Sequence, residues 1–448
     1  MLNSLKKKIR IDELSGLQLF QLVRYGSLLL ISIVLAKSGL DLESFGRYEL
    51  IIFIAGAVSF FWLTGIIQSL LPLYKNSDAF GKTTKDKGGP ELFNAFFLLL
   101  VFALAGALLI ILVAYSMPGV VEERLSMGLV PFLAAFVVFQ APSSLAEYIY
   151  VLRKKGTRAV LYGLIAFGVQ ILAVSIPAIM GLELRWILTG LVGSALLRFI
   201  WVIILLAGTS RLSLSRAFIK EHLHLGLPIM LSVLLSGSAS YIDGFIVTGY
   251  FDEDVFAVFR NGARELPLVA LLAHALSSAL VPKFNEMEPG SALAMIKERS
   301  LPLIKILFPF SLVLVIASYY LFPIFYDDRF YDSAGVFNLY LLLVITRLVF
   351  PQTILIGLKR TRILVLASAL ELVLNIALSL VLVRVWGIRG VALATVIAYA
   401  FERGFLISWI KIKLKIDPGQ YIHTGKHLAW SAAIIAVYVL VELLLGSG

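Results

Sequence analysis

Apolar segments of membrane length recur along the whole chain, and they restrict it to a helical fold in a lipid bilayer. About thirteen windows of roughly twenty apolar residues meet the length that a helix needs to cross the hydrocarbon core. They lie near 15–36, 48–73, 91–116, 128–152, 159–180, 186–207, 227–250, 256–282, 301–325, 336–357, 363–384, 390–411 and 428–446. Of the 448 residues, 60% are hydrophobic and 15% are charged, too apolar a balance for a soluble protein of this length. The sequence therefore predicts an all-α polytopic membrane protein.

Basic loops alternate with acidic or short loops, and this alternation sets the predicted orientation. Lysine and arginine gather after the second, fourth, sixth, tenth and twelfth segments, at 75–87, 153–158, 211–220, 359–362 and 411–426. Because positively charged loops stay in the cytoplasm, we expect a cytoplasmic N-terminus. The formal net charge of +11 has the same explanation, so no nucleic-acid partner is expected. The last segment either crosses the membrane or lies on its surface.

A weak internal repeat predicts two halves. The spacing from Gly181 to Thr189 matches the spacing from Gly387 to Thr395, six segments later. An even number of crossings separates the copies, so the repeat is parallel, with its axis along the membrane normal. We expect six-helix bundles at 1–208 and 225–412, forming a V around a central cavity. An amphipathic linker on the cytoplasmic surface is expected at 209–224, and an extra C-terminal transmembrane helix at 413–448.

Polar side chains form stripes at helical spacing inside three of the segments. Lipid would reject such stripes, so we expect them to line a water-filled interior. The first stripe is Gln18, Gln21, Arg24 and Tyr25; the second is Ser232, Ser236, Ser240 and Asp243; the third is Arg260, Arg264, His274 and Ser278. A histidine such as His274 is more often a packing residue than a proton relay. Asn375, one helical turn from Glu371 in the eleventh segment, is a further cavity-lining candidate.

The arginines inside the segments predict an anion site. An ionisable group at the bilayer centre costs at least ~2.5 kcal/mol, so it needs a partner or water. Guanidinium groups stay charged and bind phosphate oxygens in pairs, which suits a diphosphate. Arg24, Arg260 and Arg264 are the first candidates, and Arg198 and Arg347 are weaker ones. The alternative is that each arginine pairs with an acid inside the membrane, for example Arg260 with Asp243.

The carboxyl groups inside the segments are candidates for ion coupling. Asp243, Glu265 and Glu371 could load and release H⁺ or Na⁺, although structural pairing is the alternative for each. Glu147 lies near the end of its segment, so we expect it to reach towards the interface. The adjacent Glu402 and Arg403 should point in different directions and serve helix packing.

The chain contains no motif of an enzyme or of a nucleotide-driven motor. Cysteine is absent, and no zinc-protease, phosphate-loop or nucleophile-elbow pattern is found. We therefore expect no cofactor, no metal site and no catalytic residues. Transport would then be driven by an ion gradient, the membrane potential or the substrate gradient.

Three stretches resemble a known family. The hairpin at 364–411 carries Asn375, then Gly387, Gly390, Ala392, Ala394 and Thr395. Asp243 stands in a second stretch at 241–267, and Gly39, Phe45, Gly46 and Tyr48 stand in a third at 33–51. Together they resemble the bacterial polysaccharide exporters, the lipid-linked oligosaccharide (O-antigen) flippases of the multidrug/oligosaccharidyl-lipid/polysaccharide exporter superfamily. Phe256, Ala257 and Phe259 depart from the usual Val, Gly and Tyr, and Lys37 replaces a usual arginine, so we add Lys37 to the diphosphate ligands.

The resemblance implies an alternating-access flippase in the bacterial inner membrane. Such a protein exports an undecaprenyl-diphosphate-linked oligosaccharide from the cytoplasmic to the outer leaflet, with membrane lipids and glycan polymerases as expected partners. Three alternatives stay open. A cationic-drug exporter of the same superfamily would need an acidic, aromatic site. A membrane enzyme of glycan assembly would need a large outer loop, and a passive scramblase would ignore ion gradients.

Overall fold

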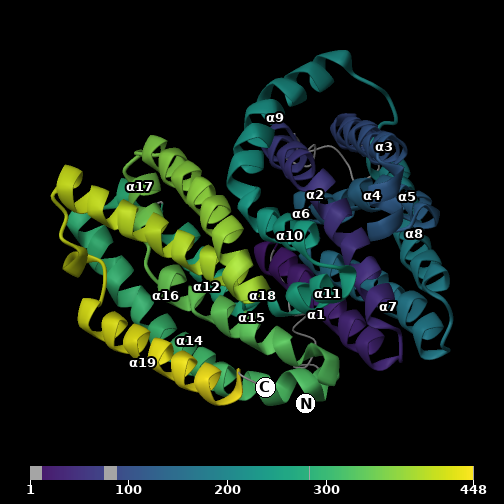
Figure 1. The fold of residues 1–448 in the computed structure, drawn as a ribbon. Helices are drawn as coiled ribbons and strands as arrows, with labels where there is room; N and C mark the ends of the chain where they lie inside the picture. The colour runs from purple at the N-terminus through teal and green to yellow at the C-terminus, as the bar shows by residue number, and fades with distance from the viewer. Residues whose placement is uncertain (1–12, 75–87, 282, 447–448) are drawn as a thin grey trace, which may run out of the picture. The chain divides into compact units, whose positions relative to one another are not determined.

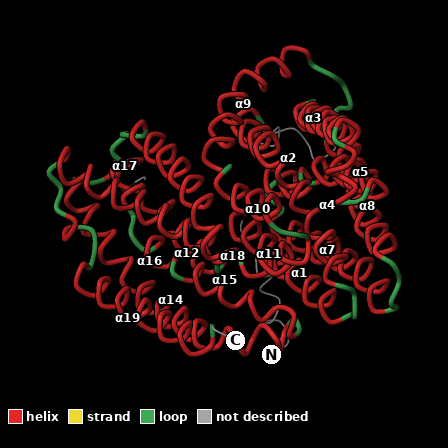
Figure 2. The backbone as a smooth tube through the Cα atoms, viewed as in Figure 1, coloured by secondary structure: helices red, strands yellow, loops and turns green. Residues whose placement is uncertain are grey.

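The computed structural model describes residues 13–74, 88–281 and 283–446, and these residues form helices joined by short connections (Figures 1 and 2). The contacts divide the chain into two compact units, Met1–Gly237 and Ser238–Gly448. The first unit contains α1 Glu13–Lys37, α2 Leu42–Leu73, α3 Glu91–Ser116, α4 Pro118–Arg124, α5 Val130–Ser143, α6 Leu145–Leu152, α7 Gly156–Ile179, α8 Leu184–Thr209 and α9 Arg216–Gly237, with the 3₁₀ turn η2 Met127–Leu129.

The second unit contains ten α-helices and two 3₁₀ turns among its described residues. They are α10 Ala239–Tyr250, α11 Glu253–Gly262, α12 Pro267–Leu280, α13 Lys283–Glu286, α14 Pro289–Phe325, α15 Tyr331–Leu341, α16 Leu343–Arg347, α17 Pro351–Gly357, α18 Arg362–Leu414 and α19 Thr424–Leu445, with η3 Asp328–Phe330 and η4 Pro418–Gln420. α19 packs along α14 (Figure 1).

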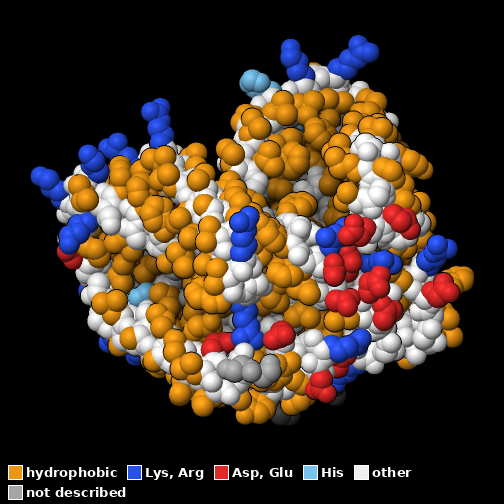
Figure 3. All heavy atoms as spheres, in the orientation of Figure 1, with side chains coloured by type: hydrophobic (Ala, Val, Ile, Leu, Met, Phe, Trp, Pro, Cys, Tyr) orange, Lys and Arg blue, Asp and Glu red, His pale blue; other side chains and the backbone are white. Residues whose placement is uncertain are grey.

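The predicted all-helical membrane fold is confirmed. Within the described part of the chain, ten helices are long and apolar enough to cross a membrane, or eleven if the bent helices between Asp328 and Gly357 count as one span. Hydrophobic side chains cover most of the face of each unit that Figure 3 draws. Many large ones are exposed, for example Leu108, Leu164 and Ile204. Since water would disfavour such a surface, these side chains are suited to contact with lipid.

The predicted hairpin at 364–411 lies within one long element, α18, that folds back at a glycine. The 53 residues of α18 are interrupted at Gly387, which has φ +58° and ψ −138° and so leaves helical geometry. Asn375 Nδ2 donates to Thr395 Oγ1 at 3.2 Å across 20 residues of sequence. A straight helix would separate these residues by about 30 Å, so the two arms must turn back on each other. In the first unit Gly181, with φ +69°, stands at the corresponding turn between α7 and α8, in agreement with the repeat spacing.

The predicted seventh and eighth segments are broken helices. α9 already begins at Arg216, inside the predicted linker, and it packs against α2, where His222 Nε2 lies 2.8 Å from the Ile66 carbonyl oxygen. The two units then divide at Gly237, within the predicted seventh segment. The predicted division into two six-helix bundles, a linker and an extra C-terminal helix stays a prediction.

The break in the eighth segment separates α11 from α12 at 263–266. Pro267 begins α12 and disfavours helical geometry in the residue before it. Gly262 ends α11 in close contact with Ser333, where a side chain would collide with the Ser333 carbonyl. The regular stripe expected from Arg260 to Ser278 is therefore interrupted, and Arg264 and Glu265 lie in a non-helical segment.

The tight turn of α18 generates a stability prediction. A Cβ added at Gly390 would collide with the backbone carbonyl of Leu382, whereas one added at Gly404 in the same helix would meet nothing within 4 Å. Gly390→Ala should lower the free energy of unfolding by about 2 kcal/mol. Gly404→Ala should leave it unchanged or raise it slightly. Thermal unfolding of the two purified variants measures the difference, and equal melting temperatures would contradict the close approach of the arms.

Candidate functional site

A buried cluster of polar side chains lies inside the first unit, which we call the Arg24 cluster. Its residues come from α1, α5, α6, α7 and α8 and from Ser144 between α5 and α6: Phe20, Arg24, Gln140, Ser143, Ser144, Glu147, Tyr162, Phe167 and Arg198. They surround a cavity of about 10 Å³, which has room for about one water molecule. Such a small cavity in a set of ionisable groups means that the groups interact through little solvent, so their charges act strongly on one another.

The Arg24 cluster carries more positive than negative charge. Glu147 is 3% exposed, and its carboxyl interacts electrostatically with both Arg24 and Arg198. Arg198 is 6% exposed, and its Nε has no hydrogen-bond partner among the described residues. Its guanidinium carbon lies 5.4 Å from the centre of the Phe167 ring, a cation–π contact. Counted as ionised, two guanidinium groups face one carboxylate, which leaves a surplus of one positive charge.

The prediction that Glu147 reaches the interface is wrong. The helix that should carry it is divided at Ser144, and the short helix α6 that follows buries Leu145, Ala146 and Glu147. The division places the carboxyl towards α1 and α8 instead of along the lipid-facing surface. Burial of a carboxylate in such a position requires cations nearby, and Arg24 and Arg198 provide them.

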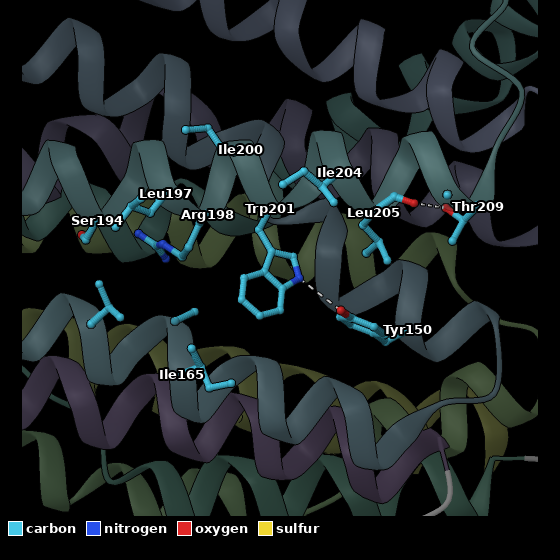
Figure 4. A pocket seen from close by; sticks show the side chains of 13 residues that line it. Tyr150, Ile165, Ser194, Leu197, Arg198, Ile200, Trp201, Ile204, Leu205 and Thr209 are labelled. Carbon is cyan, nitrogen blue, oxygen red and sulfur yellow. Dashed lines mark hydrogen bonds between the residues drawn. The ribbon is translucent and has the colours of Figure 1, made fainter.

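An open apolar groove of about 640 Å³ adjoins the cluster on the first unit. Figure 4 shows Arg198 and Trp201 extending from α8 into this groove, with Ile165 opposite them on α7. The Trp201 Nε1 donates to the Tyr150 hydroxyl at 3.1 Å. Arg198 lines both the groove and the small cavity. This one side chain therefore connects the apolar groove with the polar Arg24 cluster.

The remaining candidates of the first stripe differ in exposure. Gln18 is exposed, whereas Gln21, Arg24 and Tyr25 are half-buried. Lys37 is exposed in the last turn of α1. It therefore does not belong to the Arg24 cluster, and the sequence reasoning that grouped these cations had no signal to separate them.

A second pocket of about 490 Å³ lies at the turns of the first unit. It is lined by Asp41 and Arg47 after α1 and by Glu183 and Arg185 after α7. These two acids and two bases balance one another, and Arg47 Nη2 also pairs with Glu43 Oε1 at 2.5 Å. The pocket therefore lacks the surplus charge that distinguishes the Arg24 cluster.

A different buried cluster, which we call the Asp243 cluster, lies inside the second unit. Its members are Asp243 from α10, Tyr340 from α15, and Asn375, Ser379 and Thr395 from the two arms of α18. Asp243 Oδ2 accepts hydrogen bonds from Thr395 Oγ1 at 2.5 Å and from the Tyr340 hydroxyl at 2.8 Å. Ser379 Oγ donates to Asn375 Oδ1 at 3.1 Å. The fold-back of α18 thus brings three of these side chains together.

The Asp243 cluster has a surplus of negative charge. Asp243 is 4% exposed, and its second oxygen, Oδ1, is buried without a hydrogen-bond partner among the described residues. The neighbouring side chains are neutral hydroxyl and amide groups, with Thr395 Oγ1 also 3.4 Å from the Val391 carbonyl. Oxygen ligands of this kind suit a hard cation, and an isolated carboxylate also suits a proton.

Glu265 and Arg347 form a neutral pair in the second unit. Arg347 Nε and Nη2 donate to the two carboxylate oxygens of Glu265 at 2.6 and 2.7 Å. The guanidinium carbon lies 4.7 Å from the centre of the Tyr399 ring. Arg264 is also engaged, since its Nη2 donates to Asn261 Oδ1 at 2.8 Å. For Arg347 the pairing alternative that the sequence left open is therefore what the structure contains.

Glu371, Glu402 and Arg403 form a further buried group. Gln352 and Ser368 donate to Glu402 Oε1 at 3.1 and 3.2 Å. Arg403 Nη1 lies 3.3 Å from Glu402 Oε2, so the two adjacent side chains approach each other. The prediction that they point in different directions is wrong, because both are buried and two long side chains can bend together to form an ion pair. Glu371 is 5% exposed and interacts electrostatically with Glu402 and Asp243.

The other candidates of the second unit lie in different surroundings. Arg260 is half-buried in the last turn of α11, and His274 is exposed. The side chains of Ser236 and Ser240 lie outside the described residues. Sequence reasoning assigned Thr395 only to close packing and passed over Tyr340 and Ser379. The spacing of polar residues in the apolar segments was the one signal that could have found them.

The chain matches a known protein family over most of its length. Residues 40–335 match the model of the family described as polysaccharide biosynthesis protein. A search of curated protein sequences gives no match.

Solved membrane transporters share the fold. The lipid II flippase MurJ in an inward closed conformation is 17% identical, with TM-score 0.65 over 96% of this chain and 98% of that one. An inward-facing multidrug resistance MATE family transporter of the MOP superfamily is 15% identical, with TM-score 0.58 over 87% and 94%. An outward-facing transporter of the same description is 16% identical, with TM-score 0.51 over 91% and 95%.

The bidentate pair in the second unit generates a prediction. Arg347→Lys should lower the apparent melting temperature by an amount equivalent to about 1–2 kcal/mol, because an ammonium group can make neither the paired hydrogen bonds nor the flat contact with Tyr399. Arg329→Lys is the control, since Arg329 pairs with Asp327 at the exposed turn η3, where a lost pair costs little. If both variants unfold at the same temperature, the Glu265–Arg347 pair does not stabilise the unit as described.

Proposed function

Because the chain belongs to the polysaccharide biosynthesis protein family and has a fold shared by flippases and MATE transporters, we propose that it is a flippase for a lipid-linked glycan. It moves an undecaprenyl-diphosphate-linked oligosaccharide from the cytoplasmic to the outer leaflet of the bacterial inner membrane. Its N-terminus is cytoplasmic, as the basic loops indicate. Glycan polymerases that use the exported substrate are natural partners.

The observation that carries this proposal is the surplus positive charge of the Arg24 cluster. Buried guanidinium groups are costly unless an anion balances them. Arg24 and Arg198 share a single carboxylate, so one positive charge is left for a ligand. A diphosphate carries negative charge and several acceptor oxygens, and guanidinium groups bind such oxygens well. That Arg260, Arg264 and Lys37 also contact this group stays a prediction.

The Asp243 cluster supports coupling to an ion. Its carboxylate has one buried oxygen without a hydrogen-bond partner in the described part of the chain, and the hydroxyl groups of Thr395 and Tyr340 donate to the other. A cation or a proton bound there would neutralise the only charge in that cluster. Since three of its side chains belong to the two arms of α18, occupancy would alter how these arms hold together. That gives an ion gradient a direct way to change the shape of the second unit.

The flippase proposal predicts which variants lose transport. In vesicles with reconstituted protein, Arg24→Ala, Arg264→Ala and Asp243→Asn should each slow the flipping of a lipid-linked diphosphate glycan at least about tenfold, because a charged contact is worth ~1.4 kcal/mol or more. Arg329→Ala, in the exposed turn η3, should flip at the wild-type rate. Wild-type rates in all three site variants would show that these residues do not form the transport site.

The coupling ion can be identified from thermal unfolding. A bound ion stabilises the folded state, so a hundredfold excess over its Kd adds about 2.7 kcal/mol. If the ion is Na⁺, replacing K⁺ by Na⁺ should raise the melting temperature of the wild type and not of Asp243→Asn. If it is a proton, the melting temperature should instead depend on pH in a manner that Asp243→Asn abolishes. Asp327→Asn is the control, and equal responses of Asp243→Asn and wild type to both ions would exclude coupling at Asp243.

A further inference from the structure

We propose that Glu147 is an internal counter-anion, which occupies Arg24 and Arg198 in the empty protein, yields them to the substrate's diphosphate, and recaptures them to release it. This inference rests on the proposed function, because it concerns the same anion site. It gives a role to Glu147, which the proposed function uses neither as a ligand of the diphosphate nor as a ligand of the coupling ion. Three features of the first unit support it.

The first feature is position. Glu147 is the one acidic side chain among the described residues that line the small cavity, and Arg24 and Arg198 lie there with it. The titratable groups that interact with its charge come from α1, α6, α7 and α8: Arg24, Tyr148, Tyr162 and Arg198. Among these groups Glu147 is the one carboxyl, so no other carboxylate among them could balance the guanidinium groups.

The second feature is space. The cavity of about 10 Å³ admits roughly one water molecule and therefore no phosphate group. A diphosphate can reach both guanidinium groups only if a side chain moves. The Glu147 carboxyl lines this cavity together with both guanidinium groups, so its movement away would remove a competing anion and make room for another.

The third feature is the looseness of the pairing. Within the described residues, no ion pair of 4 Å or less joins Glu147 to Arg24 or Arg198, although both act on its charge. Arg347, by contrast, is held by Glu265 through two short hydrogen bonds. In addition, Arg198 Nε has no hydrogen-bond partner in the described part of the chain. The guanidinium groups of the Arg24 cluster are therefore only partly engaged by Glu147, which makes exchange for a better ligand feasible.

Competition between the Glu147 carboxylate and the diphosphate affects substrate binding and substrate release in opposite directions. Without the carboxylate, the two guanidinium groups would hold a diphosphate more tightly, because nothing would compete for them. Release would then be slower, since no internal anion would take the substrate's place. A residue that only supports the packing of α6 would not produce this combination of tighter binding and slower transport.

The test uses the full-length protein in nanodiscs and inorganic pyrophosphate as the probe, with affinity measured by titration calorimetry at low salt. Glu147→Gln should bind pyrophosphate at least about tenfold more tightly than the wild type, since one nearby negative charge is removed. In vesicles the same variant should flip lipid-linked diphosphate glycan more slowly. Glu147→Asp keeps the competing charge, so its affinity should stay near that of the wild type. Arg198→Gln should weaken binding at least about tenfold.

The control is Glu49→Gln, which removes another buried carboxyl of the first unit, hydrogen-bonded to Ser32 Oγ at 3.3 Å. Glu147→Leu tests the same point should the amide variant fail to fold. Pyrophosphate affinity that is unchanged or weaker in folded Glu147→Gln or Glu147→Leu overturns the inference, and so does a wild type that does not bind pyrophosphate. If the wild type still flips lipid-linked glycan in these cases, the proposed function survives. A wild type that flips none would refute that function instead.

Discussion

The cost of an unbalanced charge in a low-dielectric interior governs how the buried ionisable side chains among the described residues are arranged. An apolar bundle accepts a guanidinium or carboxylate only with a partner, water or a ligand. The second unit meets this condition in the Glu265–Arg347 pair and in the contact between Glu402 and Arg403. Glu371 adds a second buried carboxyl to the Glu402–Arg403 group. Two other places also carry a surplus: the Arg24 cluster has one positive charge too many, and the Asp243 cluster has one negative charge and no cation among its members. We propose that these two places bind the cargo and the driving ion.

Glycine turns make the Asp243 cluster possible. Asn375 and Thr395 lie 20 residues apart in one element, and they meet because the chain reverses at Gly387 and the arms approach closely at Gly390. The first unit has a similar turn at Gly181, yet its buried cluster consists of arginines and a glutamate. The same supersecondary arrangement thus holds clusters of opposite net charge in the two units.

The fold could be predicted from the sequence because lipid leaves a strong pattern. Three features can be found without knowing any tertiary contact, because they depend on the local sequence alone. They are the segment lengths, the loop charges and the glycine spacing at 181–189 and 387–395. The breaks at 237–238 and 263–266 were missed because a hydropathy window averages over them. The proline at 267 was the available signal for the second break.

The partners of individual charges could not be predicted, because they depend on how helices rotate and pack. Arg347 and Glu265 lie 82 residues apart in sequence and meet in two hydrogen bonds. Glu147 was expected at the interface, and it lies buried because its helix is divided after Ser143. Arg24 and Asp243 could be singled out from the sequence, since an ionisable residue in an apolar run stands out. Their surroundings, including Tyr340 and Ser379, became visible only in the structure.

The central claim is that this bundle selects its cargo by the negative charge of a diphosphate. It is tested most directly by comparing two lipid-linked glycans in vesicles with reconstituted wild-type protein, one joined through a diphosphate and the other through a neutral ether. The account predicts that protein-dependent flipping occurs for the diphosphate form and is absent, or at least about a hundredfold slower, for the neutral form, as expected when ~2.7 kcal/mol of charged contacts is lost. Equal rates for the two substrates would contradict it.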